Sequence, residues 1–141
     1  MAVLTQWRDA MAPDLSVLQG LASGVWEKLP RPFRQVCGDL VIRIDDFATD
    51  DVLDDLEIEN PFDLLGLYQG VSLQGHSASE LPREPDIVFL YRRAILDEWA
   101  NGEDSLGEIV AHVLIHEIGH HFGFSDSDME DIENDVLDTT R

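Results

Sequence analysis

The stretch His116-Glu117-Ile118-Gly119-His120-His121-Phe122-Gly123-Phe124-Ser125-Asp126 decides how the rest of this chain is interpreted. It contains H-E-x-x-H and continues as H-E-x-x-H-x-x-G-x-x-D. On an α-helix, residues four apart lie on one face, so His116 and His120 can offer imidazole nitrogens to one ion. Glu117 can reach a water molecule bound to that ion. The spacing therefore predicts a metal site of the kind that holds zinc for hydrolysis.

The residues that follow this helix indicate which side chain supplies the third metal ligand. A catalytic zinc usually takes three protein ligands and keeps one position for water or substrate. Gly123 is placed to end the helix, because glycine adopts positive φ without steric cost. The chain can then turn back, and Asp126 is the natural third ligand through its carboxylate. A competing interpretation takes that ligand from a glutamate of the last helix, Glu130 or Glu133.

Length and charge limit the possible functions. The 141 residues are 44% hydrophobic, which predicts one domain over residues 1–141 with its own core. Nine Lys and Arg stand against 29 Asp and Glu, so the formal net charge is −20. This balance argues against nucleic acid and anionic membrane surfaces as partners, because both need positive patches. It favours solubility and a cationic partner or substrate.

The sequence also carries signals about compartment. Cys37 is the only cysteine, so an intrachain disulfide cannot form. The first eight residues show no basic region followed by a long apolar run, as a secretory signal would. No stretch approaches the ~18 apolar residues of a membrane span. We therefore expect a cytoplasmic protein.

Apolar periodicity predicts the remaining elements. A first helix between Pro13 and Pro30 has apolar residues at helical spacing. Short runs rich in β-branched residues predict strands at 39–47, 64–73 and 86–91, followed by a short helix at 92–101. Ser105 and Glu108 form a capping box at the start of the helix that carries the motif. A last short helix follows Asp126, with Met129, Ile132 and Val136 on one side.

An acidic segment separates the first two expected strands. Nine Asp and Glu residues accumulate from Asp45 to Asp63, and no basic residue lies between Arg43 and Arg83. The EF-hand spacing with its central glycine is absent, which argues against a calcium loop. We expect a solvated loop at 46–62. If the acids at 45–63 lie near the cleft, their field should favour peptides that carry Lys or Arg.

Taken together, these segments resemble a known family. Leu-Leu-Gly-Leu-Tyr-Gln-Gly at 64–70, the strand expected at 86–91 and the motif at 116–126 are similar to the small bacterial zincin-like metallopeptidases, or minimal zincins. The similarity runs over roughly residues 14–132. It implies a compact α+β fold, with a small twisted mixed sheet packed against an N-terminal helix and the zinc-binding helix.

The resemblance also implies a site and an activity. His116, His120 and Asp126 would be zinc ligands, and Glu117 the catalytic acid/base. The expected activity is zinc-dependent hydrolysis of peptide bonds by metal-activated water. The alternative is a catalytically weak or inactive zincin-fold module that binds zinc and acts through a protein partner.

For the other polar residues near the motif or in the strands and loops, a surface or packing role is the alternative to a role at the site. We expect His112 to be a surface residue rather than a fourth ligand, His121 to pack locally, and His76 to lie in an exposed loop. Tyr68 is a candidate donor to the developing oxyanion, because an edge strand beside the metal is where an extended substrate would pair. Tyr91 is its rival for that role.

Overall fold

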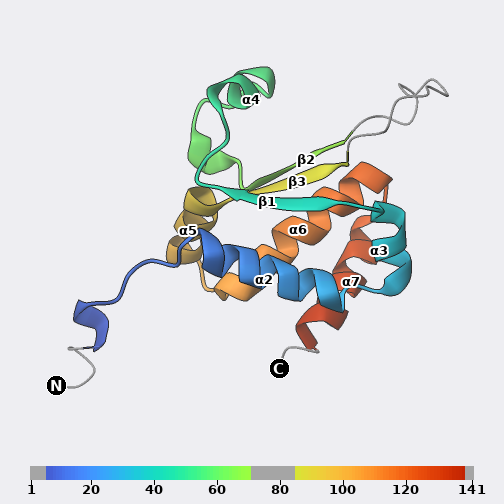
Figure 1. Ribbon diagram of the computed structural model, residues 1–141, viewed down its shortest axis with the longest axis horizontal. Helices are drawn as coiled ribbons and strands as arrows, with labels where there is room; N and C mark the ends of the chain where they lie inside the picture. Colours follow the sequence, from blue (N-terminus) through green and yellow to red (C-terminus); the bar gives the residue numbers. More distant parts are fainter. Residues whose placement is uncertain (1–5, 71–84, 139–141) are drawn as a thin grey trace.

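The computed structural model describes residues 6–70 and 85–138. None of the helices in these ranges has the length and apolarity needed to span a membrane. In chain order the elements (Figure 1) are α2 (Leu15–Lys28), α3 (Arg31–Cys37), β1 (Val41–Asp45), α4 (Asp50–Asp55), the 3₁₀ turn η1 (Pro61–Asp63), β2 (Gly66–Gln69), β3 (Ile87–Tyr91), α5 (Arg92–Asn101), α6 (Leu106–Phe122) and α7 (Asp126–Asp138).

The three strands form one mixed sheet in the order β1-β3-β2. β1 runs parallel to β3 with Ile42 opposite Val88, and β2 runs antiparallel to it with Tyr68 opposite Val88. Among residues 6–70 and 85–138, β2 therefore lies at one edge of the sheet. All three strands fall inside the ranges predicted from the sequence, although the part of the second range from residue 71 onward lies outside the described residues.

Two long helices cover one face of this sheet. α2 contacts β1, α6 contacts β2 and β3, and the two helices pack against each other (Figure 1). The largest fully buried side chains come from these layers and from α5 and α7: Leu18, Leu90, Ile95, Leu114, Ile115, Ile118, Met129, Val88, Val110 and Val136. The predicted α+β architecture is confirmed.

Helix α6 forms as its sequence predicts. The hydroxyl of Ser105 accepts a hydrogen bond from the Glu108 backbone N–H at 3.1 Å, and the Glu108 carboxylate accepts one from the Ser105 N–H at 3.4 Å. This capping box satisfies two N–H groups that the first turn leaves without helical partners. At the other end Gly123 has φ 77°, the left-handed conformation that closes helices. The motif therefore sits in the last two turns of a rigid, buried helix.

The acidic segment is not the plain loop that we expected. Thr49 caps a short helix, α4, by accepting a hydrogen bond from the Val52 N–H at 3.3 Å. Leu53 is buried beside Ala48 and Tyr91, so one apolar residue anchors the helix to the end of the sheet. A cap and a single buried leucine are enough to order a turn and a half of acidic chain here.

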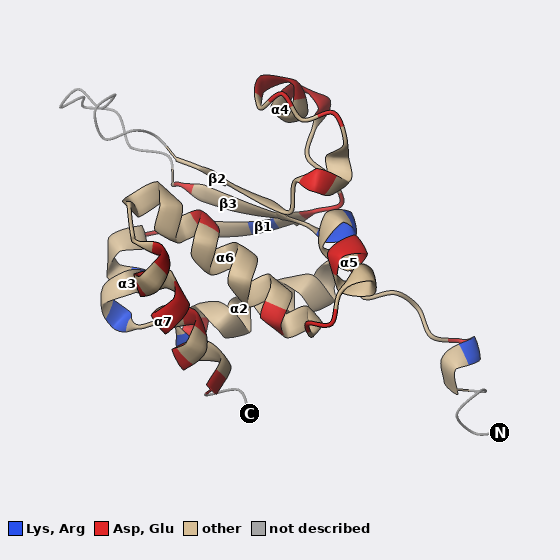
Figure 2. Cartoon of the chain, turned by 180° about the vertical axis from the view of Figure 1, so that it is seen from behind, with Lys and Arg blue, Asp and Glu red and all other residues tan. Residues whose placement is uncertain are grey.

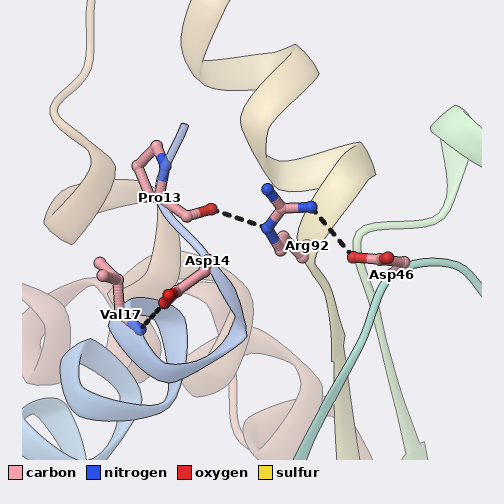
Figure 3. Close-up of polar contacts among 5 residues, drawn as sticks. All are labelled: Pro13, Asp14, Val17, Asp46 and Arg92. Carbon is pink, nitrogen blue, oxygen red and sulfur yellow. Dashed lines mark hydrogen bonds and ion pairs between the residues drawn. The ribbon is translucent and has the colours of Figure 1, made fainter. Parts of the chain in front are cut away.

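Arg92 joins three segments that lie far apart in the sequence (Figure 3). Its Nε donates to the carbonyl of Pro13 at 2.7 Å, and its Nη1 lies 3.1 Å from Oδ1 of Asp46. The neighbouring Asp14 caps α2 by accepting from the Val17 N–H at 3.0 Å. The start of α2, the residues that follow β1 and the start of α5 are thereby held together.

Candidate metal centre

Helix α6 carries three histidines at four-residue intervals, His112, His116 and His120. The ring centroids of His112 and His116 are 4.0 Å apart, and those of His116 and His120 are 5.6 Å apart with the rings nearly perpendicular. Residues at this spacing share a helix face, which explains the arrangement. The predicted pair of imidazoles is present on one side of α6.

His116 occupies the middle of this group, and its side chain is 24% exposed. Burial, followed by the neighbouring His112, lowers the pKa of His116. The carboxylates of Glu133 and Asp126 raise that pKa and His120 lowers it, with smaller effects. A lowered pKa keeps the imidazole neutral near pH 7, which is the form that binds a metal ion. The donor chemistry of this position therefore fits zinc.

Glu117 is directed to the edge strand rather than to solvent. Burial raises the pKa of Glu117, and the nearby backbone N–H of Tyr68 lowers that pKa by less. Gly66 makes the approach of α6 to β2 possible, because a Cβ at that position would lie 2.6 Å from Cγ1 of Val113 and 3.4 Å from Cγ of Glu117. The predicted base is therefore half-buried between α6 and β2.

Tyr68 has partners that the sequence did not reveal. Its hydroxyl donates to Oδ2 of the buried Asp86 at 2.6 Å, and its ring stacks on His121 with centroids 3.8 Å apart. A hydroxyl committed to a carboxylate is poorly placed to serve an oxyanion as well, so the structure does not support that role. The local packing predicted for His121 is confirmed. Tyr91 is buried, and burial raises its pKa to about 12.

Asp126, the predicted third ligand, is the first residue of α7. Helix α7 is capped by Ser125, whose hydroxyl accepts from the Asp128 N–H at 3.0 Å. The turn that begins at Gly123 brings Asp126 near enough to α6 for its charge to act on His116. Its side chain is exposed, as is that of His120. His76, in contrast, lies outside the described residues.

A different acid makes the closest approach to the histidines. Nδ1 of His112 lies 3.0 Å from Oε2 of Glu133, and Nε2 of His116 lies 3.6 Å from the same oxygen. Within the two described ranges, His112, His116 and Glu133 form the group whose three ligand atoms all lie within 4.8 Å of one another. His116, His120 and Asp126 are not gathered this tightly, and that ligand set stays a prediction.

From the sequence we predicted a surface position for His112, and we did not group it with Glu133 as a metal ligand. His112 is indeed exposed, with 58% of its side chain accessible, yet it is paired. One signal was available: Glu133 follows Asp126 by seven residues, which is two turns on the same face of α7. Both acids can therefore face α6.

Comparison with known proteins identifies the family of this chain. Residues 37–136 match the family model of the zincin-like metallopeptidases, and the match covers most of the chain. The chain therefore belongs to the zincin-like metallopeptidase family. No curated protein sequence matches it.

Proposed function

We propose that this zincin-like metallopeptidase hydrolyses peptide bonds with the help of one zinc ion. His116, His120 and Asp126 would hold the ion, and Glu117 would act as the acid/base. The observation that carries the proposal is the position of Glu117. It directly follows His116, is half-buried, and lies beside the edge strand at Gly66.

Zinc supplies Lewis acidity when bound, polarising a carbonyl and lowering the pKa of water from 15.7 to about 7 in favourable sites. The chain's own contribution is proton transfer. Glu117 accepts a proton from the attacking water at its carboxylate and passes it to the leaving amine. The water oxygen bonds to the carbonyl carbon, and the C–N bond breaks. Burial raises the pKa of Glu117, which makes its carboxylate a stronger base than an exposed one.

The edge strand supports a peptide as the substrate. The carbonyl of Leu65 accepts a hydrogen bond from the Tyr91 N–H at 2.9 Å. Because antiparallel strands alternate their hydrogen-bonding residues, the backbone N–H and C=O of Gly66 turn away from β3. This outward edge, beside Glu117, is where an extended peptide backbone can add as a further strand. Main-chain pairing would hold the peptide across the site without selecting its side chains.

Substitution of the base tests the proposal. Glu117→Gln keeps the shape of the side chain and removes the proton acceptor. We expect zinc content to stay the same while turnover of a mixed peptide library falls roughly 10²- to 10⁴-fold. Glu98→Gln, an exposed change of equal charge on α5, is the matched control and should retain full activity.

Two results would count against a peptidase. One is activity in Glu117→Gln equal to that of the unchanged protein. The other is a zinc-loaded protein that cleaves no peptide between about pH 6 and pH 9. In the second case, capture of a protein partner by the zinc-loaded chain would favour the module that acts through binding.

A further inference from the structure

Three of the four histidines of α6 form what we call the histidine row, His112, His116 and His120. The row contains two successive pairs with the four-residue spacing that suits one ion, and the pairs share His116. Only the second pair belongs to the H-E-x-x-H motif. The first pair has the closer rings, with centroids 4.0 Å apart against 5.6 Å for the second. The motif leaves this first pair unexplained.

Glu133 completes a ligand set for the first pair. Its Oε2 lies 3.0 Å from Nδ1 of His112 and 3.6 Å from Nε2 of His116. Two ligand atoms about 2.1 Å from a zinc ion at the tetrahedral angle are separated by about 3.4 Å. The two separations from Glu133 bracket this value, and all three ligand atoms lie within 4.8 Å of one another. Two imidazoles and one carboxylate are also a common donor set for zinc.

The surroundings of Glu133 favour a cation. Neither α6 nor α7 contains a lysine or an arginine, so no basic side chain of these helices neutralises the carboxylate. Seven of the thirteen residues of α7 are Asp or Glu, and Figure 2 shows their red segments along the helix. The Glu133 side chain is only 17% exposed, so solvent screens its charge less than that of a surface acid. A divalent ion at this point would offset a dense negative charge.

We propose that His112, His116 and Glu133 form a second zinc position, which alternates with the catalytic one. The two positions share His116, and its Nε2 is the atom that faces Glu133. One imidazole nitrogen binds one ion at a time, so the chain holds a single zinc with two available ligand sets. The proposal rests on the proposed function only for the catalytic set.

The second position is a non-catalytic one. Glu117 lies beside Gly66 of β2, whereas Glu133 belongs to α7. An ion held by Glu133 and His112 is displaced along α6 by about one turn, away from His120 and toward the N-terminus of α6. The base then has no activated water beside it. Zinc at this position stays bound to the protein but takes no part in hydrolysis.

Measuring the zinc affinity of the full chain tests the second zinc position without any assay of hydrolysis. Asp126→Ala weakens the catalytic set and leaves the second one intact. Competition with a chromogenic chelator should show that this variant still binds one zinc ion. Adding Glu133→Gln should weaken the residual affinity at least about 10-fold. Adding Asp131→Asn instead makes the same charge change on an exposed residue of α7 and should leave the residual affinity unchanged.

Cobalt(II) gives an independent readout, because its visible spectrum reports the donor set. In the Asp126→Ala protein, the cobalt spectrum should change on His112→Ala, and circular dichroism should show that both proteins are folded. The proposal is wrong if Asp126→Ala binds no zinc, if Glu133→Gln and Asp131→Asn have equal effects, or if the unchanged protein binds two zinc ions. A protein that fails to cleave peptides but passes these tests would disprove only the proposed function.

Discussion

Helices α4 and α7 are both rich in acidic residues, but they pack differently against the rest of the molecule. Four of six residues in α4 and seven of thirteen in α7 are acidic, so charge alone does not distinguish them. In α7, Met129 and Val136 are completely buried, and the helix contacts α6 along the histidine row. In α4, Leu53 is the one buried residue, and the helix lies beyond the end of the sheet (Figure 2).

The difference shows that packing, rather than charge density, gives an acid a chemical role. Glu133 meets His112 because Met129 and Val136 hold its helix against α6. In the described part of the chain, by contrast, no ion pair involves the four acids of α4. Such exposed charges act on their surroundings only through a field that salt screens.

The largest expected effect comes from removing the anchor of α7. Met129 is fully buried. A Cβ added at Gly119 of α6 would lie 2.3 Å from its Sδ, so the Met129 side chain packs closely against α6. Met129→Ala should lower the free energy of unfolding by about 2–5 kcal/mol. It should also weaken zinc binding, because Asp126 and Glu133 both depend on the position of α7. Urea denaturation and zinc competition measure the two effects.

Leu53→Ala is the matched control for this change. Leu53 is 7% exposed and anchors α4 in the same way, so we expect a measurable loss of stability as well. Zinc affinity should not change, because α4 contributes nothing to the histidine row. Equal losses of zinc affinity in the two variants would show that the comparison between the helices is mistaken and that the site responds only to global stability.

Parts of the molecule set by local rules could be predicted from the sequence. The capping box at Ser105 and the left-handed Gly123 are encoded within a few residues, and both predictions are confirmed. The strands followed from short β-branched runs for the same reason. The family and the fold class were also identified correctly from the motif at 116–126 and its neighbours.

Contacts between distant segments could not be predicted in this way. His112 and Glu133 are 21 residues apart, and their meeting depends on the angle at which α7 returns along α6. Tyr68 and Asp86 are 18 residues apart and meet because β2 and β3 pair. The helix at Asp50–Asp55 was missed because acids suggested a solvated loop, although Thr49 and Leu53 are a cap and an anchor.

We expect an intermediate loss of stability when the contacts of Arg92, beside the start of the acidic segment, are removed. The Arg92 side chain is 14% exposed and connects Asp46 to Pro13. Arg92→Ala removes two hydrogen bonds made by a charged group and leaves the Pro13 carbonyl without this donor. We expect a loss of about 1–3 kcal/mol in the free energy of unfolding. Arg92→Lys keeps the charge but not the fork of donors, and should recover only part of the loss.

The smallest effect concerns the field of the acids themselves. The segment that contains α4 leads through η1 directly into β2, the edge where a peptide is proposed to pair. Exposed charges act over about a Debye length, ~8 Å at physiological salt. We therefore expect kcat/KM for a Lys-rich peptide to exceed that for a matched acidic peptide at about 20 mM salt, and the preference to shrink at about 500 mM.

Two double variants assign this preference to one helix or the other. Asp54→Asn with Asp55→Asn removes two charges from α4, and Asp131→Asn with Asp135→Asn removes two exposed charges from α7. Because α4 precedes the edge strand along the chain, the first variant should reduce the low-salt preference by about 2-fold or more, consistent with pair energies below 1 kcal/mol at exposed sites. The second should reduce it less. If all proteins cleave basic and acidic peptides at equal rates at both salt concentrations, the acids of α4 serve solubility and have no part in substrate choice.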